Sequence, residues 1–279
     1  MGILSSLFSD PVATLTVLLL ALPGRLLAIC CHEAAHGWVA NKCGDPTAKM
    51  MGRVTLNPLK HLDPLGIICM LLLGIGWAKP VPVNPRNFRN PRRDDLLVSL
   101  AGITMNLILF LIGCIVLYIV LAIALLAVPV VESLSVASDF TRTTVDGTAA
   151  LISGQYWYDI ADLLHYGVSL EEILITPAFG TVGGYLYQML AYFISTNLCL
   201  AIFNLIPIPP LDGYHVLNDT VLRRKNLFAS QKWQRIGIVV LYLAMFSGIL
   251  STGLSWVFNK LMYGFGDVAF LIYRAVGLI

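Results

Sequence analysis

The chain has 279 residues, of which 57% are hydrophobic and only 12% charged, with a net charge of +2 and a mean hydropathy of +0.79. Soluble domains carry about twice that share of charge, so the composition excludes a water-soluble globular protein and indicates an integral membrane protein. No basic stretch interleaved with aromatic residues suggests a nucleic-acid partner. The length suffices for about four to six membrane spans, and we expect an all-α, polytopic helical bundle.

The first predicted span covers about residues 11–40. Arg25 is its only interior charge before a group of polar residues near its end. That group lies in CCHEAAHGW, residues 30–38, which places two histidines and a glutamate in an apolar helix. Because polar groups are costly to bury in a membrane, chance is a poor explanation for them, and a functional site is favoured.

Residues 50–85 are predicted to form a short membrane-associated β or re-entrant segment on the cytoplasmic side. The apolar run within them has about ten residues, which is too short to cross a bilayer. A Gly-x-Gly sequence and a tail with prolines at alternate positions follow this run. Irregular backbone at membrane depth is tolerated only where protein or a wet cavity covers it.

Three further spans are predicted, at about residues 96–131, 184–206 and 236–258. Each contains roughly the 20 apolar residues that a helix needs to cross a bilayer. Residues 132–183 read as a polar extracytoplasmic loop with short amphipathic stretches. No internal repeat or low-complexity linker divides the chain, so residues 1–279 are predicted to form a single transmembrane domain.

The distribution of Lys and Arg predicts the orientation of the spans. Nine of these residues lie in 41–95 and five in 207–235, but only one lies in 132–183. The positive-inside rule therefore places the first two segments in the cytoplasm and the N-terminus outside. Under this topology the stretch at residues 30–38 and the LDG at 211–213 lie at the same depth, near the cytoplasmic face.

The spacing H-E-x-x-H indicates a metal site. In a helix, His32 and His36 share one face and can bind one ion, with Glu33 near enough to act on a metal-bound water. The alternative is a pair of buried core histidines with Glu33 as their hydrogen-bonding partner. A catalytic zinc ion needs a third protein ligand. Asp212 is favoured because it follows a proline-rich turn at the end of a span, and five other residues stay open as alternatives: His215, His61, His165, Asp45 and Asp63.

Two motifs together resemble the site-2 protease family of intramembrane zinc metalloproteases. HEAAH is followed by NLIPIPPLDG, which matches the family pattern N-x-x-P-x-P-x-L-D-G at Asn204, Pro207, Pro209, Leu211, Asp212 and Gly213. GIGWAKPVPVN resembles the re-entrant G-x-G loop of the family, and AGITMN at 101–106 is similar to its A-G-P-x-x-N element, with Ile103 in place of proline. The chain resembles a minimal member without PDZ or CBS domains.

The resemblance implies roles for individual residues. His32, His36 and Asp212 would hold one zinc ion per chain, and Glu33 would be the general base. Asn204 would steady the substrate backbone or the oxyanion. Asn106 would do the same, or would form a hydrogen bond between helices. The reaction implied is hydrolysis of peptide bonds in transmembrane substrate helices near the cytoplasmic face.

A substrate helix must unwind before its peptide carbonyls can be attacked. We expect the unwound segment to pair with an edge strand near Gly74, Gly76, Ala78 and Val81. The partners expected are therefore a transmembrane protein substrate and the lipid bilayer, in a prokaryotic cell membrane. Two alternative functions are a membrane metal-ion carrier and an inactive scaffold that binds transmembrane proteins; the lack of repeated halves argues against a carrier, and the intact Glu33 against a scaffold.

Overall fold

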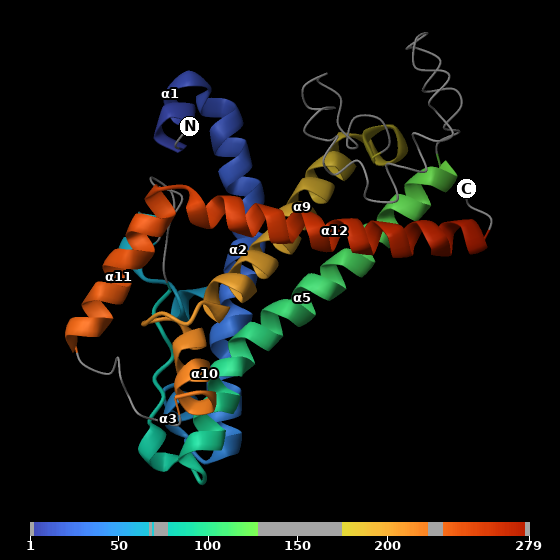
Figure 1. Ribbon diagram of the computed structural model, residues 1–279. Coiled ribbons are helices and arrows are strands. Elements are labelled where there is room, and N and C mark those ends of the chain that lie inside the picture. Colours follow the sequence, from blue (N-terminus) through green and yellow to red (C-terminus); the bar gives the residue numbers. More distant parts are fainter. Residues whose placement is uncertain (1–2, 67–68, 70–77, 128–174, 223–230, 277–279) are drawn as a thin grey trace. The chain divides into compact units, whose positions relative to one another are not determined.

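The computed structural model describes residues 3–66, 69, 78–127, 175–222 and 231–276. Within these residues the chain is mainly helical and has no strand (Figure 1). A lone antiparallel bridge joins Leu62 to Ala78. The elements, in chain order, are α1 (Ile3–Ser9), α2 (Pro11–Cys43), α3 (Thr47–Met50), η1 (Pro58–Lys60), η2 (Pro85–Asn87), α5 (Pro91–Ala127), α9 (Thr176–Leu205), α10 (Asp212–Thr220), α11 (Gln231–Phe246) and α12 (Ile249–Ala275).

Three helices, α2, α5 and α9, are long and apolar enough to cross a membrane, and the number rises to four if α11 and α12 are counted as one span. The expectation of an integral membrane protein is confirmed at this level. Helices α2 and α5 cover most of the first two predicted spans, and α9 begins eight residues before the third. The loop predicted at 132–183 and the Gly-x-Gly lie mostly outside the described residues, so both stay predictions.

The fourth predicted span, 236–258, is interrupted in the structure. Helix α11 ends at Phe246 and α12 begins at Ile249, with Gly248 between them at a φ of 77°. A left-handed backbone conformation of this kind is accessible to glycine at little cost and ends a helix. Hydropathy reports the length of an apolar run and is insensitive to a break of two residues, which is why the sequence prediction missed it.

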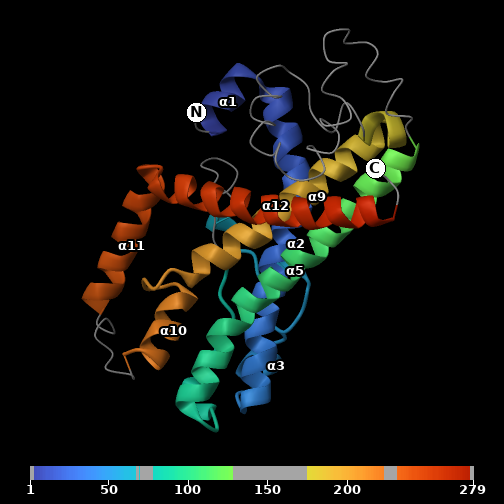
Figure 2. The same cartoon turned by 45° about the vertical axis from the view of Figure 1, so that its right-hand side comes forward.

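Helix α2 has signals at both ends that fix its limits. The side chain of Asp10 accepts a hydrogen bond from the Ala13 amide at 3.0 Å, and Pro11 occupies the first helical position. Gly44 ends the helix in the left-handed region with a φ of 110°. In both views α3 lies beside the C-terminal end of α2 (Figures 1 and 2).

The chain forms two compact units. The first contains residues 1–110 and 192–250, and the second contains residues 111–191 and 251–279. In the first unit, the C-terminal end of α2 packs against Phe88 and Val98. In the second, Ala269 and Tyr273 of α12 pack against Tyr118 of α5. All of the described polar residues considered below as site residues belong to the first unit.

Candidate metal centre

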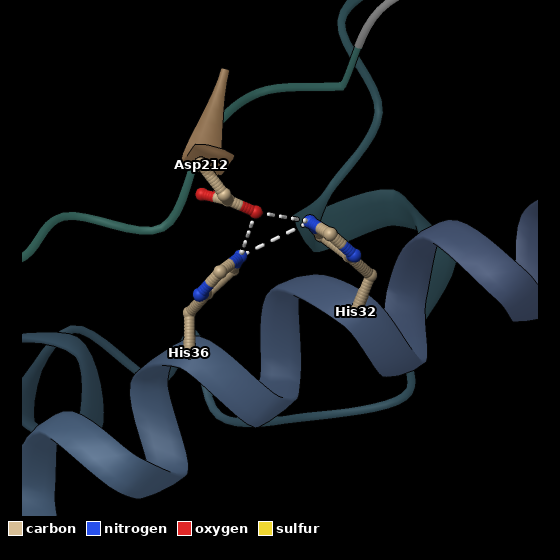
Figure 3. A group of neighbouring side chains, drawn as sticks. All are labelled: His32, His36 and Asp212. Carbon is tan, nitrogen blue, oxygen red and sulfur yellow. Dashed lines mark hydrogen bonds and ion pairs between the residues drawn. The ribbon is translucent and has the colours of Figure 1, made fainter. Parts of the chain in front are cut away.

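Three side chains from two distant parts of the sequence converge in the first unit. His32 and His36 lie one turn apart in α2 and are both buried, and Asp212 is the first residue of α10. The Nε2 atoms of the two histidines are 3.0 Å apart. Asp212 Oδ2 lies 3.3 Å from His32 Nε2 and 3.2 Å from His36 Nε2 (Figure 3). Of the candidate third ligands that the structure describes, Asp212 is the one brought to the histidines.

Asp212 reaches the histidines because the turn before α10 is unusually tight. A Cβ atom at Gly213 would lie 2.4 Å from the carbonyl oxygen of Leu205, so a side chain there would push the turn open. On the other side, a Cβ at Gly237 of α11 would lie 2.4 Å from the Pro209 oxygen. Two glycines therefore let the chain from 205 to 212 fold back closely enough to aim the carboxylate at α2.

The second ring nitrogen of each histidine is held by an oxygen atom of α5. His32 Nδ1 donates to Asn106 Oδ1 at 2.6 Å, and His36 Nδ1 donates to the Val98 carbonyl oxygen at 2.7 Å. A proton on Nδ1 leaves Nε2 with a free lone pair in a neutral imidazole. Both Nε2 lone pairs therefore point toward Asp212, the arrangement found where histidine binds a metal.

This donor set fits a zinc ion. Two unprotonated ring nitrogens and a carboxylate oxygen repel one another at these distances unless a cation lies among them. Tetrahedral zinc binds nitrogen and oxygen at about 2.0–2.2 Å, which corresponds to about 3.3–3.6 Å between ligand atoms. The separations of 3.2 and 3.3 Å to Asp212 lie at the lower end of that range, and the 3.0 Å between the two Nε2 atoms is slightly shorter. Two imidazoles and a carboxylate also form a donor set that zinc prefers, with a position left for water.

Asp212 is ionised at neutral pH, as a metal ligand must be. Burial alone would raise the pKa of this carboxyl, but hydrogen bonds from His32 and His36 in their protonated form outweigh burial and hold the pKa well below the usual range. The carboxylate is therefore ionised beside the two histidines, and a bound metal ion would take the place of the protons on Nε2.

Helix α5 can approach the histidines because Gly102 has no side chain. A Cβ at this position would lie 2.5 Å from both His32 Cε1 and His36 Nε2. Val98, Gly102 and Asn106 recur at intervals of four, so they share one face of α5. The AGITMN element thus packs against the histidine pair, and its Ile103 is buried inside an unbroken helix.

Glu33 lies on a different face of α2 from the histidines. Its Oε2 accepts a hydrogen bond from the backbone amide of Val81 at 2.7 Å. One turn further along, Gly37 is approached by the side chains of Val54 and Val81, which would lie 3.0 and 3.2 Å from a Cβ there. The loop residues around 54 and 81 therefore cover the face that carries Glu33.

The remaining predicted residues lie elsewhere or have other contacts. Asn204 Nδ2 donates to the Leu200 oxygen within its own helix at 3.0 Å, and Ala78 forms the bridge with Leu62. Gly74, Gly76 and His165 are outside the described residues. The other described candidates for the third ligand form contacts away from the centre. His61 is hydrogen-bonded to the Thr55 oxygen, and Asp45 accepts hydrogen bonds from Thr47, Asn84 and Asn87. Asp63 accepts from the amides of Leu65 and Gly66, and His215 forms an ion pair with Asp95.

Two polar residues that the sequence reasoning did not select support the centre. Asn197 of α9 is fully buried, and its Oδ1 accepts from Asn106 Nδ2 at 2.9 Å. The side-chain Nδ2 of Asn197 donates to the Phe193 oxygen at 2.9 Å. A chain of hydrogen bonds therefore runs from His32 through Asn106 of α5 to Asn197 of α9. A buried Asn in an apolar span is itself a signal that could have identified it. Arg53, which is buried in a loop, is the second.

Comparison with known proteins agrees with this geometry. Residues 20–247 match peptidase family M50. The chain belongs to peptidase family M50. This match confirms the resemblance to the site-2 protease family that the two motifs indicated.

Three relatives can be aligned over much of the chain. "Putative zinc metalloprotease YwhC" of Bacillus subtilis (strain 168) is 39% identical over 191 residues, which are 68% of this chain and 64% of YwhC, just under two thirds of that protein's length. "Putative zinc metalloprotease Rip2" of Mycolicibacterium smegmatis is 26% identical over 92% of this chain and 76% of that protein. Rip2 of Mycobacterium tuberculosis (strain H37Rv) is 27% identical, with coverages of 84% and 71%. No solved structure matches the chain.

Proposed function

We propose that this member of family M50 is an intramembrane zinc metalloprotease of the HExxH type. The observation that carries the proposal is the convergence of His32, His36 and Asp212 from α2 and α10. Family membership, the names of the relatives and the apolar helices support it. We assign one zinc ion per chain, bound by these three side chains.

Zinc, when bound, lowers the pKa of a coordinated water to about 7 and polarises the peptide carbonyl. The protein contributes the orientation of the ligands. Asn106 and the Val98 carbonyl hold each imidazole in the tautomer that offers Nε2, and the Asn106–Asn197 contact fixes the amide of Asn106 in turn. We therefore assign Asn106 to positioning His32.

Glu33 is the proposed general base. It follows His32 directly in α2, and Val81 holds its Oε2, which leaves Oε1 to take a proton from the attacking water. The same carboxyl group then delivers that proton to the nitrogen of the departing amine. Transfer of this kind by a positioned carboxylate contributes about 10²–10⁴ in rate.

The proposed substrate is a transmembrane helix, cut near the cytoplasmic face. The excess of Lys and Arg in 41–95 and 207–235 supports this orientation. Docking of the unwound substrate strand at 74–81 and a role for Asn204 at the oxyanion remain part of the proposal. The Val81 amide is already bonded to Glu33, so an incoming strand would pair with other backbone groups of that segment.

The test is cleavage of a transmembrane reporter by purified protein in liposomes. Wild type should cleave, should lose activity when zinc is chelated, and should recover it when zinc is restored. Glu33→Gln should bind zinc and not cleave. Zinc flux into the liposomes without cleavage would instead identify a carrier, and substrate binding without cleavage by wild type would identify a scaffold.

A further inference from the structure

Residues 78–84, AKPVPVN, lie outside the helices, and backbone hydrogen-bond donors are scarce among them. Pro80 and Pro82 have no amide proton, so Val81 offers the one backbone donor between Lys79 and Val83. That donor is spent on Glu33 Oε2, at 2.7 Å. The alternation of prolines thus directs one amide at the proposed general base.

Arg53 holds the same segment from its other side. Its side chain is buried, with 7% of the residue exposed, and Nη2 donates to the carbonyl oxygens of Lys79 at 2.7 Å and Pro80 at 3.2 Å. Among the described residues no ion pair joins Arg53 to a carboxylate. Burying a guanidinium group costs free energy, and here two carbonyl oxygens of this segment receive its hydrogen bonds.

The Pro80 oxygen and the Val81 nitrogen are the two ends of one planar peptide group. A guanidinium group therefore touches the oxygen of this peptide while the Glu33 carboxylate touches its N–H. A cation at the carbonyl end polarises the peptide and strengthens the N–H as a donor. Arg53 is itself fixed by its backbone, since its amide donates to the Ala48 oxygen at 2.9 Å beyond the end of α3.

We propose that Arg53 is a positioning residue for Glu33, acting through the peptide group between Pro80 and Val81. Arg53 sets where that amide lies, and the amide sets the orientation of the carboxylate beside His32. This inference rests on the proposed function, because it assigns Glu33 as the base. The two proposed histidine ligands are held by α5, and Asp212 by the turn before α10. Neither is held by this segment, so the loss of Arg53 should affect turnover and leave zinc binding intact.

Kinetics with four variants test the proposal. Arg53→Met should lower kcat by about 10–100-fold, as expected for misplacement of a catalytic group, with KM and zinc affinity unchanged. Arg53→Lys, which keeps a cation near the two carbonyls, should retain part of the lost activity. Val81→Pro should reproduce the defect of Arg53→Met. Val83→Pro is the matched control, because Val83 also follows a proline and its amide has no hydrogen-bond partner among the described residues.

Hydrogen exchange on the zinc-free protein gives a readout independent of cleavage. Residues 78–83 contain four exchangeable amides, on Ala78, Lys79, Val81 and Val83. Arg53→Met and Glu33→Ala should each speed exchange at Val81, while Lys79, bonded to the His61 oxygen, stays protected. If Arg53→Met does not fold, Arg53→Lys carries both measurements, and Val81→Pro carries the kinetic one.

Two results would overturn the positioning role of Arg53. In the first, Arg53→Met has the same kcat as wild type and the same rate of exchange at Val81. In the second, Arg53→Met loses zinc affinity to the same extent as it loses kcat. The second would make Arg53 a general support of the fold. If wild type does not cleave, the proposed function fails, and if Glu33→Gln cleaves as fast as wild type, Glu33 is not the base. In either case the exchange experiment still decides whether Arg53 controls the contact between Val81 and Glu33.

Discussion

Two stripes of residues run side by side on α2 and have different neighbours. The metal stripe, His32 and His36, faces Val98, Gly102 and Asn106 of helix α5. The base stripe, Glu33 and Gly37, faces irregular chain from Arg53 to Val54 and from Lys79 to Val81. The two proposed histidine ligands are therefore held by helix packing, and the proposed base by a loop.

The contrast suggests a division of labour. Ligand atoms must hold fixed separations to bind a metal tightly, and packed helices provide such rigidity. A base that moves a proton between two partners needs the correct orientation of its carboxylate, and it depends less on rigid surroundings. If this is right, changes at one stripe should alter zinc affinity and changes at the other should alter turnover.

The largest effect is expected from removal of a proposed ligand. Asp212→Ala deletes the negative charge among the three donors and leaves two neutral imidazoles. Zinc affinity should fall by more than the 10–100-fold typical of outer-shell changes, and cleavage should disappear with it. Chelator competition and a cleavage assay measure both. Retention of wild-type zinc affinity by this variant would exclude Asp212 as a ligand.

The next largest effect separates the two stripes. Glu33→Gln keeps the shape of the side chain and its acceptor for the Val81 amide, but removes the basic oxygen. The cleavage rate should fall by about 10²–10⁴, and zinc content should stay at one per chain. Single-turnover cleavage on zinc-loaded protein measures the loss of rate. A rate within a few-fold of wild type would remove Glu33 from the role of base.

Gly102→Ala tests the contact between α5 and the metal stripe. The new methyl group would lie 2.5 Å from both rings, so α5 must move away. We expect a destabilisation of about 1–3 kcal/mol, typical of overpacking, together with weaker zinc binding. Gly264→Ala in α12 is the control, because a Cβ there meets nothing within 4 Å; it should be neutral or slightly stabilising.

The smallest effect concerns the far end of the loop that covers the base stripe. Buried Asp45 accepts hydrogen bonds from the Asn84 amide at 2.7 Å and from Asn87 Nδ2 at 2.8 Å. Burial raises the pKa of Asp45, but these bonds and those from Thr47 outweigh it, so the pKa in the folded protein lies below its ordinary value.

A pKa that is lower in the folded state stabilises the protein above the unfolded-state pKa and ceases to do so as pH falls through the folded value. Asp45→Asn should therefore cost about 1–2 kcal/mol at pH 7, and the difference from wild type should shrink below about pH 4. Unfolding in detergent across this pH range measures it. A difference that does not depend on pH would mean that the charge of Asp45 contributes nothing.

The metal stripe could be proposed from the sequence, whereas most of the contacts around it could not. The i, i+4 spacing of His32 and His36 is local, and Asp212 carries a recognisable motif at the end of an apolar helix. The contact between Asn106 and His32 spans 74 positions and depends on how α5 packs, so the motif around Asn106 left its role open. Arg53 meets Pro80 across 27 positions of irregular chain, which no periodicity describes. Long-range contacts of this kind are set by tertiary structure alone.

The most direct test of the division of labour is the zinc dissociation constant of wild type, Asn106→Leu and Glu33→Gln, measured by chelator competition. Asn106→Leu leaves His32 Nδ1 without its acceptor, whereas Glu33→Gln changes the base stripe alone. We predict about 10–100-fold weaker zinc binding in Asn106→Leu and unchanged binding in Glu33→Gln. Equal weakening in both, or none in Asn106→Leu, would contradict it.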